Sequence, residues 1–411
     1  MKILAIETSC DETAIAILDA RGKLDSATGP RFFVCGNALI SQIDIHKEFG
    51  GVFPALAKRE HAKNLVPLLR KALKEARMLG SRNRTRRDMY TVFSKQLMEI
   101  LEREPLLLEQ VLEVLPTIKK PPIDALAVTY GPGLAPALWV GINFARALAL
   151  VWNLPIIPVN HMHGHIAAGL FKISATWRVM RQQKTSHNHI EFPLLALLIS
   201  GGHTELVLMK DFKTFKVIGE TRDDAAGEAF DKVARMLGLP YPGGPQISAL
   251  AREARERKIP TEKYLAAPLP RPMIKSNDLD FSFSGLKTAV LYALRAIEKQ
   301  TRAHTLAFAR ELEDAIADVL CAKVKKALEV SHARTFVLGG GVSANTHIRS
   351  TLVKLIADTY PETEIRVPPP ELATDNAIMI GMAAYVVLAN NINLLTQKPD
   401  IAADGNARLG D

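Results

Sequence analysis

Residues 2–19, KILAIETSCDETAIAILD, place two apolar runs on either side of a short polar one. The runs at 2–7 and 14–19 are predicted to be β-strands, and the small and polar residues 8–13 are predicted to form the hairpin tip between them. A second unit of this kind lies at 193–209, where Ser200-Gly201-Gly202-His203-Thr204 separates two apolar runs. The two halves of the chain therefore contain a quasi-duplicated strand–turn–strand unit rather than a short tandem repeat.

Glycine-rich loops accompany the predicted strands. They are Gly131-Pro132-Gly133, Gly243-Gly244 and Gly339-Gly340-Gly341. Glycine after an apolar strand lets backbone N–H groups approach a phosphate without a Cβ in the way. The spacing fits neither a Walker A loop nor the dinucleotide-binding pattern. Together with the tip at 8–13, these loops predict a cleft that holds a nucleotide.

A pair of histidines, His161 and His165, is spaced for metal binding. Residues four apart lie on one face of a helix, so both rings can reach one ion. Asp375, at the start of an apolar helical run, is the best candidate for a third ligand. Two imidazoles and one carboxylate suit Fe(II), which we favour, or a catalytic Zn(II). His163 lies on the other side of the helix and is expected to face solvent or to support the site.

Composition and length indicate a globular protein of two domains. Its start, MKILAIE, reaches acidic residues too early for a secretory signal. The longest apolar stretch, 134–152, contains Pro136, Asn143 and Arg146, so it is expected to be a buried helix and not a membrane span. Three cysteines without a CxxC motif favour a reducing, cytoplasmic location.

The net charge of +9 is concentrated in two places. Residues 70–87 contain eight Lys or Arg, including Arg82, Arg84, Arg86 and Arg87, against one acid. A second basic segment spans 172–184. Clustered cations are expected of a nucleic-acid-binding surface, although a solvated charged face is the alternative. The first cluster opens a predicted helical insertion, about 79–120, with helices at 90–104 and 106–115. The second lies in a basic insertion at about 171–191.

Nine motifs, in order, resemble one family. They are residues 6–13 (IETSCDET), 131–133 (GPG), 161–165 (HMHGH), 200–205 (SGGHTE), 224–232 (DAAGEAFDK), 241–245 (YPGGP), 281–287 (FSFSGLK), 339–345 (GGGVSAN) and 374–376 (TDN). The chain is similar to the tRNA N6-adenosine threonylcarbamoyltransferases, the TsaD family, of the bacterial type. The resemblance runs from Lys2 to about Val387 and leaves out the two insertions and the tail.

The resemblance implies an α/β fold of the actin-like, sugar-kinase and Hsp70 type, with two lobes built from duplicated ribonuclease-H-like subdomains. We expect one lobe at 1–159, carrying the helical insertion and completed by about 376–395. The other lobe, 160–375, would carry the metal and substrate sites, and 396–411 would form a tail.

The resemblance also implies a reaction. L-threonylcarbamoyladenylate would donate its threonylcarbamoyl group to N6 of adenosine-37 in tRNAs that read codons beginning with A, releasing AMP. By position, His161, His165 and Asp375 match the family's metal ligands. The positions that match its substrate-binding residues are Leu198, Ile199, Ser200, Gly201, Gly202, Asp231, Gly244 and Asn345. A TsaB-type dimerisation partner and a TsaE-type ATPase are implied as partners, with tRNA as substrate and no membrane.

The adenine N6 nucleophile is poor because its lone pair is conjugated with the ring, so a base is useful. Asp11 and Glu12, at the first hairpin tip, are our candidates. For Glu12, hydrogen bonding to loop amides is the competing interpretation. The arginines at 82, 84, 86 and 87 are candidates for tRNA contact.

Three other functions were considered. An actin-like ATPase or phosphotransferase would leave the histidine pair without a role. A non-catalytic scaffold subunit would be expected to have lost the ligands, and all three are present. A zinc protease of the His-Glu-x-x-His type would need Glu directly after the first histidine, where this sequence has Met162. The transferase is the function we favour.

Overall fold

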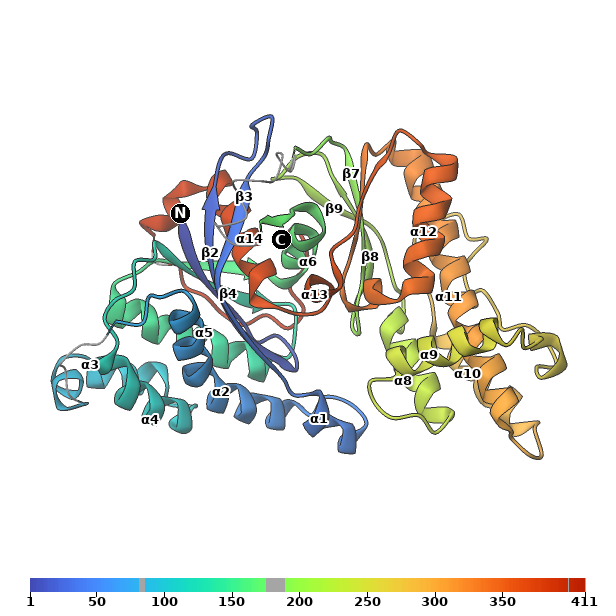
Figure 1. The fold of residues 1–411 in the computed structure, drawn as a ribbon, viewed down its shortest axis with the longest axis horizontal. Helices are drawn as coiled ribbons and strands as arrows, with labels where there is room; N and C mark the ends of the chain where they lie inside the picture. Colours follow the sequence, from blue (N-terminus) through green and yellow to red (C-terminus); the bar gives the residue numbers. More distant parts are fainter. Residues whose placement is uncertain (81–85, 175–188, 398, 411) are drawn as a thin grey trace.

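The computed structural model describes residues 1–80, 86–174, 189–397 and 399–410, with the side chains of 86–92 and 174 outside that description. Two mixed β-sheets form its framework (Figure 1). The first has the order β5-β4-β1-β2-β3-β6 and the second the order β11-β10-β7-β8-β9. The first sheet comprises β1 Lys2–Glu7, β2 Glu12–Arg21, β3 Arg31–Ser41, β4 Ala125–Gly131, β5 Ile156–Asn160 and β6 Ile173–Ser174. The second comprises β7 Leu194–Ile199, β8 Thr204–Met209, β9 Phe215–Glu220, β10 Thr335–Gly339 and β11 Glu364–Arg366.

Both sheets repeat one topology. In each, the first three strands form an antiparallel meander, and the fourth and fifth strands add in parallel beside the first. This duplication is the ribonuclease-H-like repeat of an actin-like fold, as predicted. The two sequence hairpins, β1–β2 and β7–β8, are the equivalent parts of the two sheets.

Helices fill three layers around the sheets. Before β7 they are α1 Ile43–His46, η1 Lys47–Phe49, α2 Pro54–Glu75, α3 Arg86–Ile100, α4 Pro105–Val114, η2 Leu115–Thr117, α5 Ala135–Trp152 and α6 His161–Leu170. After β9 they are α8 Ala226–Met236, α9 Gly243–Glu256, η3 Thr261–Lys263, α10 Ser284–Arg295, α11 Arg302–Ser331, η4 Gly341–Ala344, α12 Thr346–Thr359, α13 Pro370–Ala373, α14 Ala377–Asn390 and η5 Ile392–Leu395.

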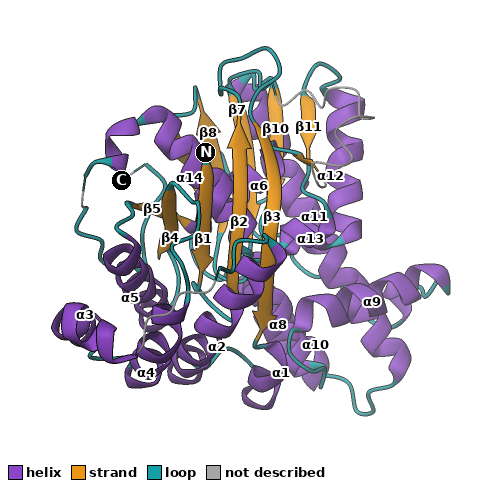
Figure 2. Cartoon of the chain, turned by 60° about the vertical axis from the view of Figure 1, so that its left-hand side comes forward, coloured by secondary structure: helices purple, strands orange, loops and turns teal. Residues whose placement is uncertain are grey.

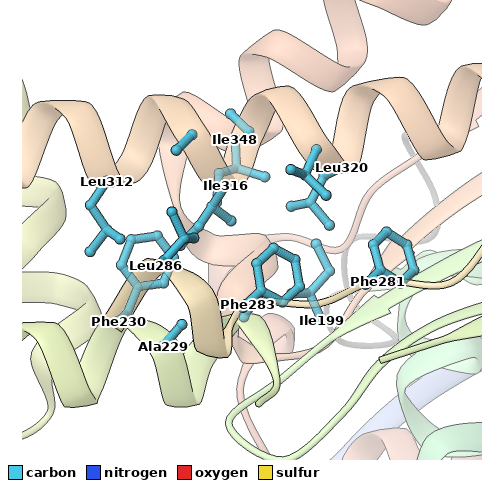
Figure 3. Close-up of a cluster of buried hydrophobic side chains, with 14 of the residues drawn as sticks. Ile199, Ala229, Phe230, Phe281, Phe283, Leu286, Leu312, Ile316, Leu320 and Ile348 are labelled. Carbon is cyan, nitrogen blue, oxygen red and sulfur yellow. The ribbon is translucent and has the colours of Figure 1, made fainter. Parts of the chain in front are cut away.

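Three hydrophobic cores hold these layers together. α2, α4 and α5 cover the outer face of the first sheet, and α8 to α12 cover the outer face of the second. Helices α6 and α14 lie between the two sheets and share a core with both, as Figures 1 and 2 show. Figure 3 shows the outer core of the second sheet, where Phe230 of α8, Phe283 directly before α10 and Ile316 of α11 meet.

The central strand of each sheet is buried on both faces. In β1, Ile3 and Ala5 point into the core between the sheets, while Leu4 and Ile6 point into the outer core. β7 alternates in the same way along its length. Strands that are covered on both faces contain continuous apolar sequence. This explains why residues 3–6 of β1 and all residues of β7 are apolar.

Most predicted elements are present, with shifted ends. β2 begins at Glu12, so the turn passes into the strand within the predicted tip, and Glu12 and Thr13 already pair with β3. α2 begins at Pro54, because Pro suits the first helical position. The predicted helical insertion contains α3 and α4, with Pro105 at the start of α4. The lobe boundaries stay a prediction.

Two further segments bear on the layout. α5 is the one helix of the described residues that is long and apolar enough to cross a membrane, and it packs in the outer core of the first sheet. The predicted tail is not free: Ile401 and Leu409 are buried, and the Gly133 amide donates to the Gly405 carbonyl.

We expect Gly141→Ala, in α5, to destabilise the protein. A Cβ at Gly141 would lie 2.3 Å from the Thr8 Oγ1, whose hydroxyl donates to the Ala137 carbonyl. Overpacking of this kind costs about 1–3 kcal/mol. The matched control is Gly285→Ala in α10, where the nearest atom to the new Cβ, on Pro272, is 3.6 Å away. Chemical denaturation should show a loss for the first variant and no loss for the second; equal stability of both would contradict the packing argument.

Candidate metal and substrate site

The polar residues of the site lie where buried strands end. Glu7 ends β1, and Ser9 follows it. His161 follows β5, and Ser200 follows β7. In sheets of this type, ligands bind beyond the carboxyl ends of the strands, because the strands themselves are covered on both faces.

Two capped helices bring the predicted ligands together. The Asn160 side chain accepts from the Met162 amide at 2.9 Å and starts α6 at His161. The Asn376 side chain accepts from the Met379 amide at 2.9 Å and starts α14 directly after Asp375. Asn is a preferred N-cap because its oxygen satisfies a free amide of the first turn. The caps therefore fix where each ligand-bearing segment begins.

Close packing of α6 on α14 completes the cluster. A Cβ at Gly164 would lie 3.0 Å from side-chain atoms of Met379 and Ile380, so glycine lets the two helices approach. The Asp375 Oδ1 then lies 3.3 Å from the His161 Nε2 and 3.2 Å from the His165 Nε2. The structure thus brings all three predicted metal ligands together, with their ligand atoms within 4.8 Å of one another.

A buried carboxylate orients His161 from behind. The Glu7 Oε2 lies 3.2 Å from the His161 Nδ1, and Glu7 is fully buried. The same oxygen accepts from the Thr129 hydroxyl at 2.5 Å, and Oε1 accepts from the Ser9 amide at 2.6 Å. A proton on Nδ1 leaves the Nε2 lone pair facing Asp375, which is the carboxylate–histidine arrangement found behind metal sites.

The charges of the cluster are strongly coupled. Burial opposes charge on all of these groups, but Asp375 and Glu7 together raise the pKa of His161. His161 in turn lowers the pKa of Asp375 and that of Glu7. Burial lowers the pKa of His165, so that ring is neutral and keeps a lone pair for a ligand.

The residues present fit a divalent metal. Both ring nitrogens of His165 are buried and make no hydrogen bond within the described part of the chain. Metal–ligand bonds of about 2.1 Å place neighbouring ligand atoms about 3.0–3.4 Å apart, and the two Asp375–histidine separations of 3.3 and 3.2 Å fall in that range. Imidazole nitrogen and carboxylate oxygen are donors that suit iron or zinc.

The predicted bases, Asp11 and Glu12, lie beside this cluster. Asp11 is 8% exposed. Burial, then the charges of Asp11 and Asp375, raise the pKa of Glu12 to about 10, so the side chain is protonated at neutral pH. The Ser41 hydroxyl donates to the Glu12 Oε1 at 3.3 Å. A neutral Glu12 can donate a hydrogen bond but accepts a proton poorly, which favours Asp11 as the base.

The glycine loop after β7 is exposed, whereas the last two residues of β7 are buried. Gly201 and Gly202 are exposed, and a Cβ on either would meet nothing within 4 Å. The Ser200 Oγ accepts from the amides of Gly202 and His203. Leu198 and Ile199 are fully buried with side chains in two different cores, so only their backbones can contact a substrate.

The remaining predicted substrate residues already have internal partners. Asp231, on α8, accepts from the Gly243 amide at 2.6 Å and so holds the turn that contains Gly244. The Asn345 oxygen caps α12 by accepting from two amides, and its NH2 group donates to Glu313 at 2.6 Å. The Asn345 side chain is therefore occupied by the fold, which a motif match alone does not reveal.

Other sequence predictions fall elsewhere. Arg82 and Arg84 lie outside the described residues, and Arg86 and Arg87 begin α3 with side chains that are also outside them. His163 points away from the cluster: its ring lies 4.2 Å from that of Phe215, and it lines cavities of about 400 and 520 Å³.

Sequence reasoning missed Glu7 and Ser9 as partners of His161. The Ser9 hydroxyl lies 3.2 Å from the His161 Nδ1, 152 positions away in the chain. The available signal was a carboxylate closing an otherwise apolar strand, since a buried charge requires a partner.

Comparison with known proteins identifies close relatives. The TsaD family model, described as tRNA N6-adenosine threonylcarbamoyltransferase, matches residues 33–81 and 99–382. A tRNA N6-adenosine threonylcarbamoyltransferase from Moorella thermoacetica is 40% identical over 384 residues, covering 93% of this chain and 91% of that protein. The gap in the family match, 82–98, contains all four candidate arginines, whereas the basic segment at 171–191 lies within the match.

Solved structures with a similar course of the chain are more distant. Full-length HypF in its phosphate- and nucleotide-bound form has a TM-score of 0.48 and 13% identity, over 95% of this chain and 46% of that one. A ROK hexokinase from Thermus thermophilus has a TM-score of 0.40 and 11% identity, over 95% of this chain and 100% of that one.

The repeated sheets and the capped His–His–Asp cluster define an actin-like α/β enzyme with a metal-type site at the strand ends. Within that class the chain belongs to the TsaD family of tRNA N6-adenosine threonylcarbamoyltransferases. It is therefore a transferase that modifies tRNA.

The raised pKa of Glu12 predicts a pH effect on stability in the metal-free protein. The pKa is 4.5 for an ordinary Glu and about 10 in the fold, so stability present at low pH is lost as pH rises. Glu12→Gln removes this titration and should abolish roughly 2 kcal/mol of the loss between pH 5 and pH 8. Denaturation of chelated protein at both pH values measures it, with the exposed Glu362→Gln as control. A wild type and Glu12→Gln variant with the same pH dependence would mean that Glu12 ionises freely.

Proposed function

We propose that the protein transfers the threonylcarbamoyl group from L-threonylcarbamoyladenylate to N6 of adenosine-37 in tRNAs reading codons that begin with A, with release of AMP. Family membership combined with an assembled His161–His165–Asp375 cluster carries this proposal. We also propose that the protein acts in the cytoplasm, where its tRNA substrate is found.

His161, His165 and Asp375 would hold one divalent metal, which we propose to be Fe(II), with Zn(II) as the alternative. When bound, such an ion would supply Lewis-acid polarisation of a donor oxygen. Glu7 keeps the His161 ring oriented through Nδ1. His161 and His165 lie on α6, and Asp375 directly precedes the N-cap of α14, which packs on α6, so the site would need little rearrangement to bind the ion.

The donor would lie along the loop after β7. Gly201 and Gly202 are exposed and carry no Cβ, so an anhydride or phosphate can approach the backbone of this loop closely. Asp231 would contribute by holding the Gly243–Gly244 turn, at the N-terminus of α9, where a helix favours an anion. Asn345 would act in the same way, by fixing the N-terminus of α12.

Attack of N6 releases AMP, which is already a good leaving group, so positioning provides most of the rate. The N6 proton would pass to Asp11. The neutral Glu12 beside it would donate a hydrogen bond to the carbonyl of the threonylcarbamoyl group that N6 attacks, or to the Asp11 carboxylate.

A TsaB-type dimerisation partner would dock on an exposed apolar patch formed by the end of β3, α1, η1 and the start of α2. The patch comprises Leu39, Ile40, Ile45, Phe49 and Phe53. Phe49 and Phe53 are 58% and 52% exposed and stack with ring centroids 5.7 Å apart. Large exposed apolar side chains that pack on each other, as Phe49 and Phe53 do, mark interaction surfaces. A TsaE-type ATPase is proposed as a further partner from family membership alone.

Transfer of labelled threonylcarbamoyl from its adenylate to an ANN-decoding tRNA tests the function, with TsaB- and TsaE-type partners present. We expect Asp375→Asn to lose the bound divalent metal by elemental analysis and to lose ~100-fold or more of the rate. Glu371→Gln, an exposed carboxylate four residues away, is the matched control and should keep both. Wild-type metal content and product from Asp375→Asn would remove the metal role; no product from wild type would reject the transferase.

Arg82, Arg84, Arg86 and Arg87 are proposed to contact the tRNA backbone on the strength of their charge. Replacing all four by Ala should weaken tRNA binding ~10-fold or more at 100 mM salt and flatten its salt dependence, because each phosphate contact adds about 0.7–0.9 to the slope. The control replaces the exposed Lys210, Lys213 and Lys216 instead. Filter binding across a salt series measures both quantities, and an unchanged slope would reject the contact.

A further inference from the structure

The turn that carries Asp11 and Glu12 rests on three buried polar side chains from outside the motifs. They are Gln42, which precedes α1, His46, which ends α1, and His61, in α2. Each of the three is 0% exposed. The backbone N–H of Gln42 also donates to the Asp11 backbone carbonyl at 2.8 Å. The metal cluster does not involve them.

The contacts at the turn determine the protonation of His61. Its Nε2 lies 3.0 Å from the Cys10 carbonyl oxygen, which can only accept, so Nε2 carries the proton. Burial lowers the pKa of His61 to about 4, so the ring is neutral and Nδ1 accepts. The Thr13 hydroxyl, 2.8 Å away, and the Gln42 Nε2, 3.3 Å away, are its two neighbours.

The contacts at the other end determine the protonation of His46 independently. The Phe53 backbone N–H can only donate, and it lies 3.4 Å from the His46 Nδ1. The neutral ring therefore carries its proton on Nε2, which lies 3.2 Å from the Gln42 Oε1. The contacts to His46 and to His61 require the same orientation of the Gln42 side-chain amide, with its oxygen toward His46 and its NH2 group toward His61.

The hydrogen bonds of this series all point the same way. They run from Phe53 to His46 and then to Gln42, whose NH2 group lies 3.3 Å from the His61 Nδ1 and 3.4 Å from the Thr13 Oγ1. The Thr13 hydroxyl, 2.8 Å from the same Nδ1, donates to His61 as well, and His61 donates to Cys10. A buried donor or acceptor without its partner costs about 1–3 kcal/mol. If His46 stops donating, the Gln42 oxygen is left unsatisfied. Rotation of the amide would then place that oxygen against the His61 lone pair. Loss of one hydrogen bond therefore disturbs the whole series from Phe53 to Cys10.

We propose that Gln42, His46 and His61 form a hydrogen-bond relay of fixed direction that positions the segment Cys10–Thr13, where the turn passes into β2, and with it Asp11 and Glu12, from the junction of α1 and α2. They are positioning residues: Gln42 and His61 bond to residues 10–13, and His46 acts through Gln42. The assignment of this turn to the reaction rests on the proposed function.

The far end of the relay lies at the proposed docking patch. Phe53, whose amide begins the relay, is half-exposed there and stacks on Phe49. A TsaB-type partner that reorganises this junction on docking would change the first hydrogen bond of the relay. The relay therefore offers a physical route by which that partner sets the arrangement of Asp11 and Glu12.

Two substitutions at His46 separate the two ends of the relay. In His46→Gln the side-chain NH2 can replace Nε2–H and keep the bond to Gln42. In His46→Asn the oxygen can replace Nδ1 and keep the bond from Phe53, but the donor to Gln42 is lost. Both replace one buried ring by one amide side chain. Asn is one methylene shorter and leaves the larger cavity, so its extra structural cost is measured as a loss of global stability. Chemical denaturation establishes that both are folded.

Two measurements compare the variants. One is hydrogen–deuterium exchange of the Gln42 backbone amide, and the other is the kcat and KM of threonylcarbamoyl transfer. We expect ~10-fold faster exchange and a ~10-fold lower kcat in His46→Asn than in His46→Gln, since one lost buried hydrogen bond is worth about that factor. The KM for tRNA should stay within ~2-fold, as the relay does not contact it.

Equal exchange in the two variants would overturn the relay, and different exchange with equal kcat would overturn its role in positioning Asp11 and Glu12. Failure of the proposed function would look different: the exchange difference would be present while the wild type made no product.

Discussion

Burial of both faces of the two central strands is the constraint on which the rest of this structure depends. β1 and β7 each pair on both edges and face a hydrophobic core on both sides. Such strands leave room for polar chemistry only at their ends. Glu7 and the loop starting at Ser200 occupy those ends, and the duplicated topology gives each sheet one such position. The metal-type cluster and the open glycine loop are therefore consequences of how the sheets are covered.

The helices between the sheets convert that constraint into a site. α6 and α14 lie in the shared middle layer, so each must pack against the other and against a sheet. Gly164, inside the histidine motif, permits the close approach. Asn160 and Asn376 cap the two helices, which places His161 at the start of α6 and Asp375 directly before the N-cap of α14, with 3.3 Å between the His161 Nε2 and the Asp375 Oδ1. Packing and capping, and not the histidine spacing alone, bring the carboxylate to the imidazoles.

Electrostatics explain why this region holds so many polar groups. The charge of Asp375 acts on the pKa of Glu7 and on that of Glu12, and the charge of Asp11 acts on the pKa of Glu12. Burial and the neighbouring acids raise the pKa of the Glu12 carboxyl, that of the Cys10 thiol and that of the Tyr241 phenol. A cation at the His–His–Asp cluster would relieve part of this repulsion. The turn at Cys10–Thr13 must stay ordered against it, which is the task assigned to Gln42, His46 and His61.

The sequence by itself determined the two hairpins, the glycine loops, the helical insertion and the histidine pair, because each depends on residues close together in the chain. Asp375 could be chosen from its position before an apolar helix and from the resemblance to a family. Tertiary structure alone decided that Glu7 backs His161, that the Asn345 side chain is used by the fold, and that the last residues pack on Gly133. It also decided the relay from Phe53 to Cys10. These features join positions tens to hundreds of residues apart, and no local periodicity encodes a contact whose geometry exists only after the sheets and helices have packed.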